Sequence, residues 1–355
     1  MLNRLHQQLW QTIVVRCPPA ARRIATLKGG LKYAFFTAQR ENLADNLRAA
    51  FPAKSVREIM RLCRAIYVAT ERNSVDQFRL ELLTEAQMRP ALSQIELRGQ
   101  AHIEQAYREG RPVILVTPHY GNFMLGALRV AADYAKNGVY FFYNPPERNS
   151  YAEKSNKLLE RPASNCHKIY NNSHGLKTAL KVLKAQGTLC MMPDLISVTA
   201  SALYVPFFGR FFTAMSGIAF LALRSNAVVI PAYCYAAENG RQVLEFRPPL
   251  ALTERTKQSD DDRVYELTCL LFSELERQIT RRPEHWRYWR VYIKRSISLL
   301  VPPSSASDLR TQLRKSAPMV SSDKHLSDIV QQWIESLDQS KPAIPNPAIE
   351  AREFG

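Results

Sequence analysis

The stretch Pro112-Val-Ile-Leu-Val-Thr-Pro-His-Tyr-Gly-Asn-Phe-Met-Leu-Gly126 decides the fold of this 355-residue chain. Its apolar run 113–116 is rich in β-branched residues and predicts a short strand buried on both faces, as in a parallel sheet. The run ends at Thr117-Pro118, and a helical pattern resumes from about Phe123. His119 therefore lies between the carboxyl end of a buried strand and a helix, where open α/β sheets place their ligands.

The flanking sequence alternates between apolar runs and amphipathic helices. Such alternation is typical of βαβ units with right-handed crossovers. We therefore predict an α/β fold with a mainly parallel central sheet flanked by helices. The predicted strands are 95–99, 113–117, 139–143, 188–192, 228–230 and a peripheral one at 243–249, and the predicted helices are 101–109, 150–159, 173–184 and 262–281.

Three regions of different composition follow along the chain. Residues 1–90 read as a basic helical region, residues 91–295 as the α/β domain, and residues 296–355 as linkers around a short amphipathic helix at 325–337. The pattern of the first 40 residues predicts a cationic amphipathic helical segment. Such a segment either lies in a membrane interface or packs on the main domain, and the pattern leaves both open.

Charge and composition limit the partners. The net charge of +16 and pI near 9.7 imply an anionic partner such as phospholipid headgroups, nucleic acid or an acidic carrier protein. No nucleic-acid-binding signature is present, so a nucleic-acid partner is not predicted. The six cysteines are scattered, which argues against a metal site or disulfide framework and for the cytoplasm. No apolar run reaches the ~20 residues that span a bilayer, so we expect any contact with the inner membrane to be peripheral.

The stretch Val113-Ile-Leu-Val-Thr-Pro-His-Tyr-Gly-Asn-Phe123 resembles the first motif of the lipid A late acyltransferases, the lauroyl and myristoyl transferases of the glycerolipid acyltransferase superfamily. The resemblance implies an enzyme that moves a fatty acyl group from an acyl-carrier-protein or coenzyme A thioester to an acceptor, with no cofactor. It extends over roughly residues 40–295. Later blocks that match in order include Met192-Pro-Asp194, Tyr204-Val-Pro-Phe-Phe-Gly-Arg210, Ala227-Val-Val-Ile-Pro231 and Pro283-Glu-His-Trp-Arg-Tyr-Trp289.

One motif position departs from the family pattern. These enzymes carry His-x4-Asp/Glu, in which the histidine removes the acceptor proton and the acid orients the histidine. His119 matches as the general base, but the acid is replaced by Met124. Loss of an orienting carboxylate costs ~10⁴ in rate in a comparable base. We predict that another acid substitutes, with Asp194 at the end of a neighbouring predicted strand as first candidate and Glu147 as second.

Two alternatives to a substitute acid stay open. The acceptor is an amine or another group that needs a weaker base, or the chain is a catalytically degenerate homologue that binds lipid or acyl carrier as a scaffold. A second departure favours the scaffold: Tyr143-Asn144-Pro145 stands where the family commonly has Tyr-Arg-Pro.

The resemblance also implies substrate-binding residues. Gly121 and Asn122 match the first motif, Gly209 and Arg210 match the later block, and Arg148 could replace the arginine missing at position 144. A guanidinium at such positions suits a phosphate or carboxylate.

Two aromatic clusters lie outside the first motif. Phe207, Phe208, Phe211 and Phe212 read as core more than acyl groove. The aromatic residues of the segment 286–289 are mixed with arginines, which is typical of a headgroup boundary.

Overall fold

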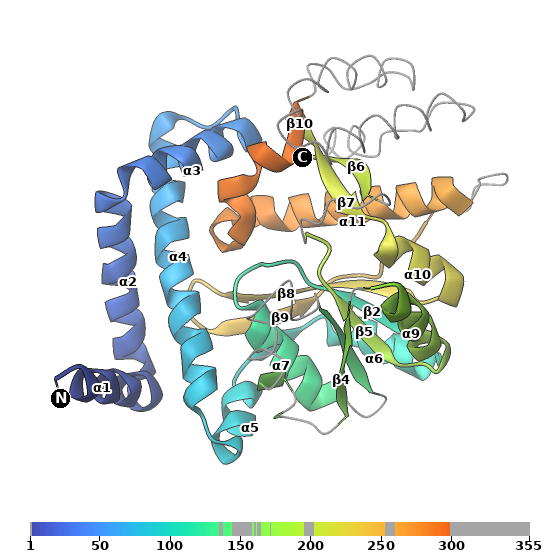
Figure 1. Ribbon diagram of the computed structural model, residues 1–355, viewed down its shortest axis with the longest axis horizontal. Coiled ribbons are helices and arrows are strands. Elements are labelled where there is room, and N and C mark those ends of the chain that lie inside the picture. The colour runs from blue at the N-terminus through green and yellow to red at the C-terminus, as the bar shows by residue number, and fades with distance from the viewer. Residues whose placement is uncertain are drawn as a thin grey trace.

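A seven-stranded sheet forms the centre of the computed structural model, which describes residues 2–134, 138–143, 158–159, 161, 165–170, 172–194, 202–252 and 260–298. Its strand order is β1-β9-β8-β2-β5-β3-β4, with helices on both faces (Figure 1). Five neighbouring strands, β8, β2, β5, β3 and β4, run parallel, whereas β9 and β1 run the other way. The predicted α/β fold with a mainly parallel sheet is therefore confirmed.

The strands of this sheet follow the apolar runs of the sequence. Their bounds are β1 Glu96–Arg98, β2 Val113–Val116, β3 Val139–Tyr143, β4 Cys166–Tyr170, β5 Thr188–Met191, β8 Val228–Ala236 and β9 Gln242–Phe246. β9 lies between β8 and β1, so its predicted position at the periphery was wrong. β4 was not predicted, because this edge strand exposes His167 and Lys168 and lacks a continuous apolar run.

Strand β2 lies at the middle of the sheet and is buried on both faces. Val113 and Leu115 belong to the core cluster under α6 (Gln100–Arg108) and α7 (Phe123–Tyr134). Ile114 and Val116 belong to the cluster on the opposite face, under α9 (Ser173–Lys184), α10 (Gly217–Ser225) and α11 (Asp260–Arg281). Because successive side chains of a strand point to opposite faces, burial on both explains the continuous apolar run.

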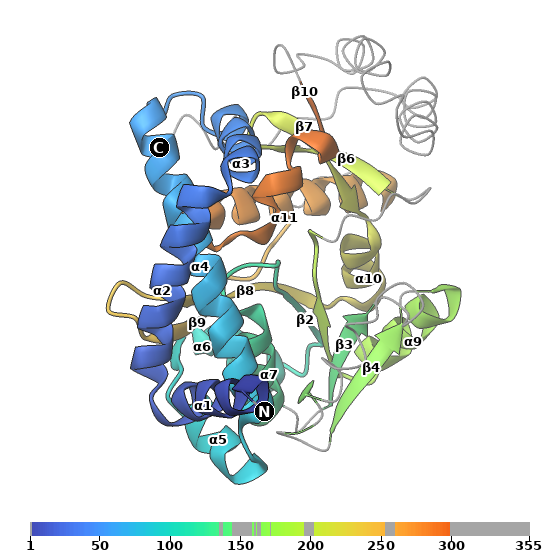
Figure 2. The same ribbon diagram turned by 60° about the vertical axis from the view of Figure 1, so that its left-hand side comes forward.

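Five helices precede the sheet: α1 Leu2–Arg16, α2 Pro18–Phe35, α3 Thr37–Ala50, α4 Val56–Leu82 and α5 Glu85–Ser93. Capping boxes fix the starts of the last two, with Ser55 and Glu58 at α4 and Thr84 and Gln87 at α5. The long helices α2 and α4 run side by side along one flank of the molecule (Figures 1 and 2). None of the helices in the described residues combines the length and apolar character needed to cross a bilayer.

A second sheet, with three antiparallel strands in the order β10-β7-β6, lies beside α11 (Figure 1). Its strands β6 and β7 follow β5 in the sequence, and β10 follows α11. It consists of β6 Ala202–Phe207, β7 Arg210–Met215 and β10 Ser296–Ser298. Between α11 and β10, the chain makes the 3-10 turns Pro283–His285, Arg287–Val291 and Ile293–Arg295. The predicted helix at 150–159 lies mostly outside the described residues, and the tail helix at 325–337 lies entirely outside them.

Aromatic side chains join this second sheet to the N-terminal helices in one core. Phe207, Phe208 and Phe212 pack in the same cluster as Leu43, Ile59 and Tyr67, and Phe211 is also buried. The prediction that the four phenylalanines are core residues is confirmed. Trp286 and Trp289 are 1% and 0% exposed, so the prediction that they lie at a headgroup boundary was wrong. Their indole rings pack edge to face, with centroids 4.8 Å apart, in the same core.

Candidate functional site

The parallel pairing of β2 with β5 brings His119 next to Asp194. Val116 and Met191 are paired across the two strands, and each of the two polar residues follows three positions later. Neighbouring parallel strands end at the same edge of a sheet, so equal offsets place both side chains at one point. This is the edge at which the sequence predicted the site.

Main-chain hydrogen bonds hold the His119 turn in place from two directions. The Asn122 N–H donates to the Cys234 carbonyl of β8 (2.8 Å), and the Gly121 N–H donates to the His285 carbonyl (2.8 Å). The His119 carbonyl in turn accepts from the Arg287 N–H (3.0 Å). A segment more than 160 positions away in the chain thus supports the turn.

Gly121 is required by this turn for a steric reason. Its φ is +53°, and a Cβ built on it would lie 2.2 Å from the Cys234 carbonyl oxygen. No residue with a side chain fits that approach without moving the backbone. The geometry accounts for the glycine through the backbone alone, and its predicted substrate-binding role stays a prediction.

The Asp194 carboxylate, 1% exposed, is held by three hydrogen-bonding groups of His119 and Trp286. Oδ1 lies 3.0 Å from His119 Nδ1, and Oδ2 accepts from the His119 backbone N–H (2.9 Å) and from the Trp286 indole Nε1 (3.0 Å). A carboxylate oxygen accepts, so we assign the donor of this hydrogen bond to Nδ1–H of the imidazole. The lone pair is therefore on Nε2, the nitrogen that a general base at this position would use.

Two aromatic rings flank the imidazole of His119. The Phe123 ring lies 5.1 Å from it and the Tyr288 ring 4.9 Å, both at steep angles. Burial, followed by the negative charge of Asp194, raises the pKa of Tyr288 to about 12, so its hydroxyl stays protonated at neutral pH. The side chain of His119 is 15% exposed, which leaves one edge of the ring accessible. The two rings hold the imidazole plane in place, and neither of them is charged at neutral pH.

A cavity of about 220 Å³ lies next to these residues. Phe123 and Trp286, which contact His119 and Asp194, are part of its wall. Helix α4 contributes a polar stripe at helical spacing, and the exposed Arg287 and Arg290 add positive charge. The residues of the stripe are Thr70, Asn73, Ser74 and Gln77. The wall thus combines an apolar side with hydrogen-bonding groups, two arginines and one acid, Glu284, as expected of a site for an amphipathic ligand with a polar head.

A second histidine, the buried His285, lines this cavity. Burial, together with the positive charge of Arg282, lowers the pKa of His285 to about 4. His285 is therefore neutral at neutral pH, and its carbonyl serves the turn of Gly121. Within the described residues, no cluster of three His, Cys, Asp or Glu side chains could hold a metal ion.

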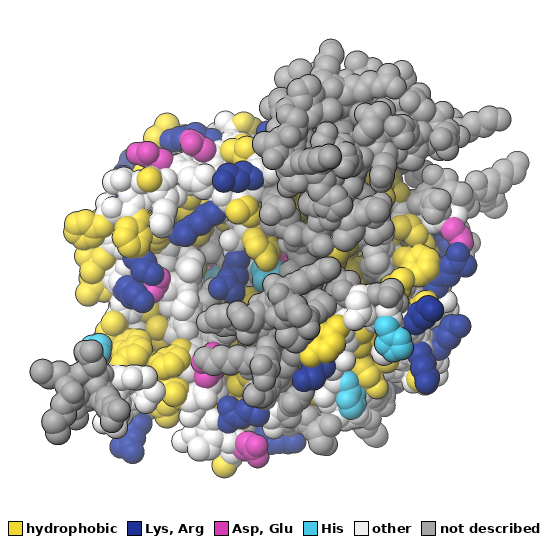
Figure 3. Space-filling model, viewed as in Figure 1, with side chains coloured by type: hydrophobic (Ala, Val, Ile, Leu, Met, Phe, Trp, Pro, Cys, Tyr) yellow, Lys and Arg dark blue, Asp and Glu magenta, His cyan; other side chains and the backbone are white. Residues whose placement is uncertain are grey.

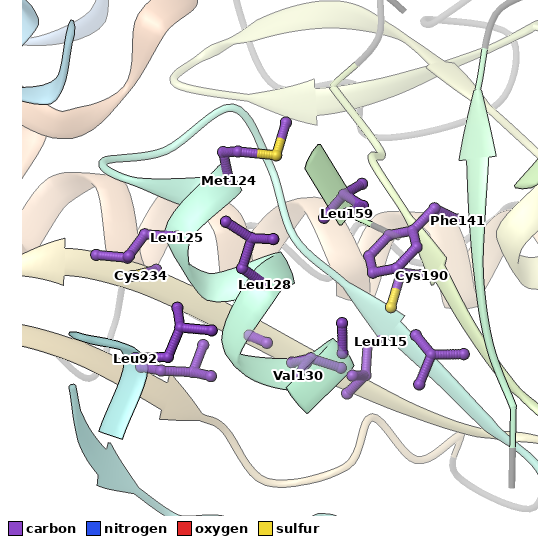
Figure 4. Close-up of a cluster of buried hydrophobic side chains, with 14 of the residues drawn as sticks. Leu92, Leu115, Met124, Leu125, Leu128, Val130, Phe141, Leu159, Cys190 and Cys234 are labelled. Carbon is purple, nitrogen blue, oxygen red and sulfur yellow. The ribbon is translucent and has the colours of Figure 1, made fainter. Parts of the chain in front are cut away.

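Met124 packs in the apolar core at the start of α7. It is 9% exposed and belongs to the same cluster as Leu125, Leu128 and Leu159 (Figure 4). Position 124 also borders the cavity. Since Asp194 already occupies His119 Nδ1, an acid at position 124 would lack the contact that the family motif implies for it.

We expect Met124→Glu to lower the free energy of unfolding by roughly 3 kcal/mol, because it puts a carboxylate in place of an apolar side chain of the core cluster. Turnover should not rise. Chemical denaturation and a turnover assay measure the two effects, with Met124→Leu as the volume-matched control that changes neither by much. A gain in turnover by the glutamate variant would show that Asp194 does not orient His119.

Asn122 lies in a polar network that ties α2 and α4 to the sheet. Its amide Nδ2 donates to Asp76 Oδ2 (3.0 Å), which also accepts from Gln242 (3.1 Å), and Arg22 binds both oxygens of the same carboxylate. Asn122 is 5% exposed and borders the cavity. The network explains an asparagine here structurally, and binding of substrate by its side chain stays a prediction.

Gly209 and Arg210 lie in another part of the molecule. With Phe208 (φ +50°), Gly209 (φ +72°) makes the two-residue turn between β6 and β7, in which both residues are left-handed. The Arg210 guanidinium donates to the Ser296 hydroxyl (2.6 Å) and carbonyl (3.1 Å) of β10. Neither is part of the cavity wall described above. Glu147 and Arg148 fall outside the described residues, so their predicted roles stay predictions.

Trp286 and Tyr288 are site residues that the sequence did not reveal. Both were interpreted as surface anchors because arginines surround them. Their contacts join positions 92 and more apart in the chain, so no local pattern marks them.

The chain is similar in sequence to proteins named as acyltransferases. Residues 6–293 match the family described as "Bacterial lipid A biosynthesis acyltransferase". The chain is 27% identical to a "Lipid A biosynthesis acyltransferase" of Haemophilus influenzae over 54% of this chain and 56% of that protein. It is 24% identical to a "Phosphatidylinositol mannoside acyltransferase" of Mycolicibacterium smegmatis over 64% of this chain and 73% of that protein. The chain thus spans little more than half the length of the Haemophilus relative.

Proposed function

Because the chain belongs to the bacterial lipid A biosynthesis acyltransferase family, we propose that it transfers a fatty acyl group from a thioester to a hydroxyl or amine acceptor. The observation that carries this proposal is the hydrogen bond between His119 Nδ1 and the buried carboxylate of Asp194. It supplies from a neighbouring strand what Met124 cannot supply. It also favours an active enzyme over a degenerate scaffold, since a binding protein has no need of an oriented base.

In the proposed reaction, Nε2 of His119 takes the proton of the acceptor as its oxygen or nitrogen attacks the thioester carbonyl. The resulting imidazolium is stabilised by Asp194 across the Nδ1 hydrogen bond. The tetrahedral intermediate collapses, the carbon–sulfur bond breaks, and the leaving thiolate takes the proton from His119. The products are an ester or amide and a free thiol, and the base returns to its starting state.

The acceptor that we propose is an anionic glycolipid. The names of the two relatives refer to lipid A and to phosphatidylinositol mannoside, both of them glycolipids. The polar stripe of α4 offers hydroxyl and amide groups to a sugar, and Arg287 and Arg290 offer positive charge to phosphate. The donor is an acyl-carrier-protein or coenzyme A thioester, and the net charge of +16 suits both an acidic carrier and an anionic membrane. We place the reaction at the cytoplasmic side of the inner membrane.

The test measures release of free thiol and formation of acylated lipid by the purified chain. Acyl carrier protein and coenzyme A thioesters are compared as donors, with phosphorylated glycolipid, neutral glycolipid and no lipid as acceptors. We expect transfer that requires the phosphorylated glycolipid. A folded protein that binds the thioester and transfers nothing to any acceptor would contradict the proposal and support the scaffold alternative.

Trp286 positions the Asp194 carboxylate in this scheme. Trp286→Phe keeps an aromatic ring and removes the N–H that binds Oδ2, so we expect kcat to fall about tenfold with KM within about twofold. Trp289→Phe is the matched control, because that equally buried indole donates to the Pro283 carbonyl and has no bond to Asp194. Equal losses of kcat in the two variants would reduce the role of Trp286 to packing.

A further inference from the structure

Helix α2 packs against the protein through its small residues. Ala21, Ala25 and Gly29, spaced four apart, form its buried side. A Cβ built on Gly29 would lie 2.7 Å from Val68 Cα of α4, so the two backbones are in close contact there. This spacing permits a close helix pair around Gly29, and farther along α2 the ring of Tyr33 packs against Tyr67 of α4, with centroids 6.2 Å apart.

Four large apolar residues of α2 point outward instead. Ile24, Leu27, Leu31 and Phe35 are 44%, 66%, 49% and 75% exposed, and their spacing places them on one face of the helix. Together with the adjacent Phe36 (45% exposed) they form what we call the α2 ridge. Hydrophobic side chains interspersed with Lys and Arg gather along the flank where Figure 1 places this helix (Figure 3). An ordinary surface helix has the opposite distribution.

The charge around the ridge has one sign. No Asp or Glu occurs among the first 40 residues, whereas that segment contains Arg4, Arg16, Arg22, Arg23, Lys28, Lys32 and Arg40. The acids that face this region from α4 are Glu71 and Asp76, whose side chains are only 8% and 11% exposed and are paired with Lys28, Lys32 and Arg22. Arg16 and Arg23 are exposed. The outer surface of α2 is therefore apolar and cationic.

From this distribution we infer that the α2 ridge docks on the surface of an anionic lipid bilayer. The apolar face would insert to the level of the headgroup and acyl boundary, about 5–10 Å deep, and the cations would face lipid phosphates. A second copy of the same surface fits less well, because it would bring cations of like sign together. The inference rests on the proposed function in one respect only, which is that the enzyme acts on lipids at a membrane. Docking through α2 would bring α4, which lines the cavity, close to the lipid surface.

The experiment is sedimentation of the full chain with vesicles, without thioester or acceptor. Vesicles of phosphatidylcholine alone are compared with vesicles containing about a quarter phosphatidylglycerol. We expect binding to the anionic vesicles, and Leu27→Glu should weaken it about tenfold or more, because it replaces an inserted side chain with a repelled charge. Val56→Glu is the matched control: both positions are 66% exposed, and Val56 lies at the start of α4, outside the ridge.

Several results would overturn the inference. These are no binding of the wild type to anionic vesicles, equal losses in the two variants, or a wild-type dimer that Leu27→Glu dissociates while vesicle binding is kept. Turnover with a detergent-dispersed acceptor is measured in parallel. Wild-type turnover of Leu27→Glu in detergent, combined with lost vesicle binding, separates failure of docking from failure of the proposed chemistry.

Discussion

Turnover of the thioester should fall by roughly 10³- to 10⁴-fold when His119 is replaced by alanine, because the reaction then loses the base that takes the acceptor proton. We do not expect His285 to replace His119 as the base. The hydrogen bond that His285 makes to the His119 turn comes from its backbone carbonyl, not from its imidazole ring. The change should act on kcat more than on KM, because the imidazole contributes to the transition state and little to the binding of the acyl chain. Single-turnover measurement of thiol release separates the two effects.

His167→Ala is the matched control for this prediction. His167 is an exposed histidine on the edge strand β4, so its loss removes an imidazole without touching the site. It should keep wild-type turnover. Similar rates for His119→Ala and the wild type would show that His119 is not the general base. They would support the alternative that the chain binds lipid or acyl carrier without catalysis.

Asp194→Asn should lower kcat by about 10³- to 10⁴-fold while the chain stays folded. Both oxygens of Asp194 accept hydrogen bonds, Oδ1 and Oδ2 together, from His119 and the Trp286 indole. An asparagine side chain has only one oxygen that can accept, so it cannot keep all of these hydrogen bonds. The imidazole then loses the partner that sets its tautomer and that stabilises the imidazolium. The rate loss should therefore match that of His119→Ala, and the double variant should be little worse than either, because the two residues act as one unit.

The control for Asp194→Asn is another buried carboxylate. Glu274 is 5% exposed and pairs with Arg247 and Arg277, not with His119. Glu274→Gln should lower the free energy of unfolding and leave kcat unchanged. If Asp194→Asn unfolds no more easily than Glu274→Gln and keeps full kcat, the substitute-acid proposal is wrong.

The local sequence was sufficient for the elements that make the site. The apolar run 113–116 predicts the central strand, because only a strand buried on both faces has no polar residue at any position. The helix at 173–184 was predicted with its observed bounds, since its apolar and basic residues follow helical periodicity. Asp194 was a candidate because it ends a strand expected to neighbour the His119 strand.

The tertiary structure alone decided two things. These are the contacts between residues that are distant in the sequence and the side of each helix that is buried. Pairing of β2 with β5 in one register set the distance between His119 and Asp194, and the segment 285–288 supplied Trp286 and Tyr288 from the other end of the domain. The sequence of α2 shows an amphipathic helix, but either side could be buried. Packing on α4 selected the small residues Ala21, Ala25 and Gly29, because close approach of two helices gains more contact area than burying a few large side chains at a greater distance. Local periodicity therefore determined the elements, and the packing of neighbours determined which side chains are available for chemistry and for a membrane.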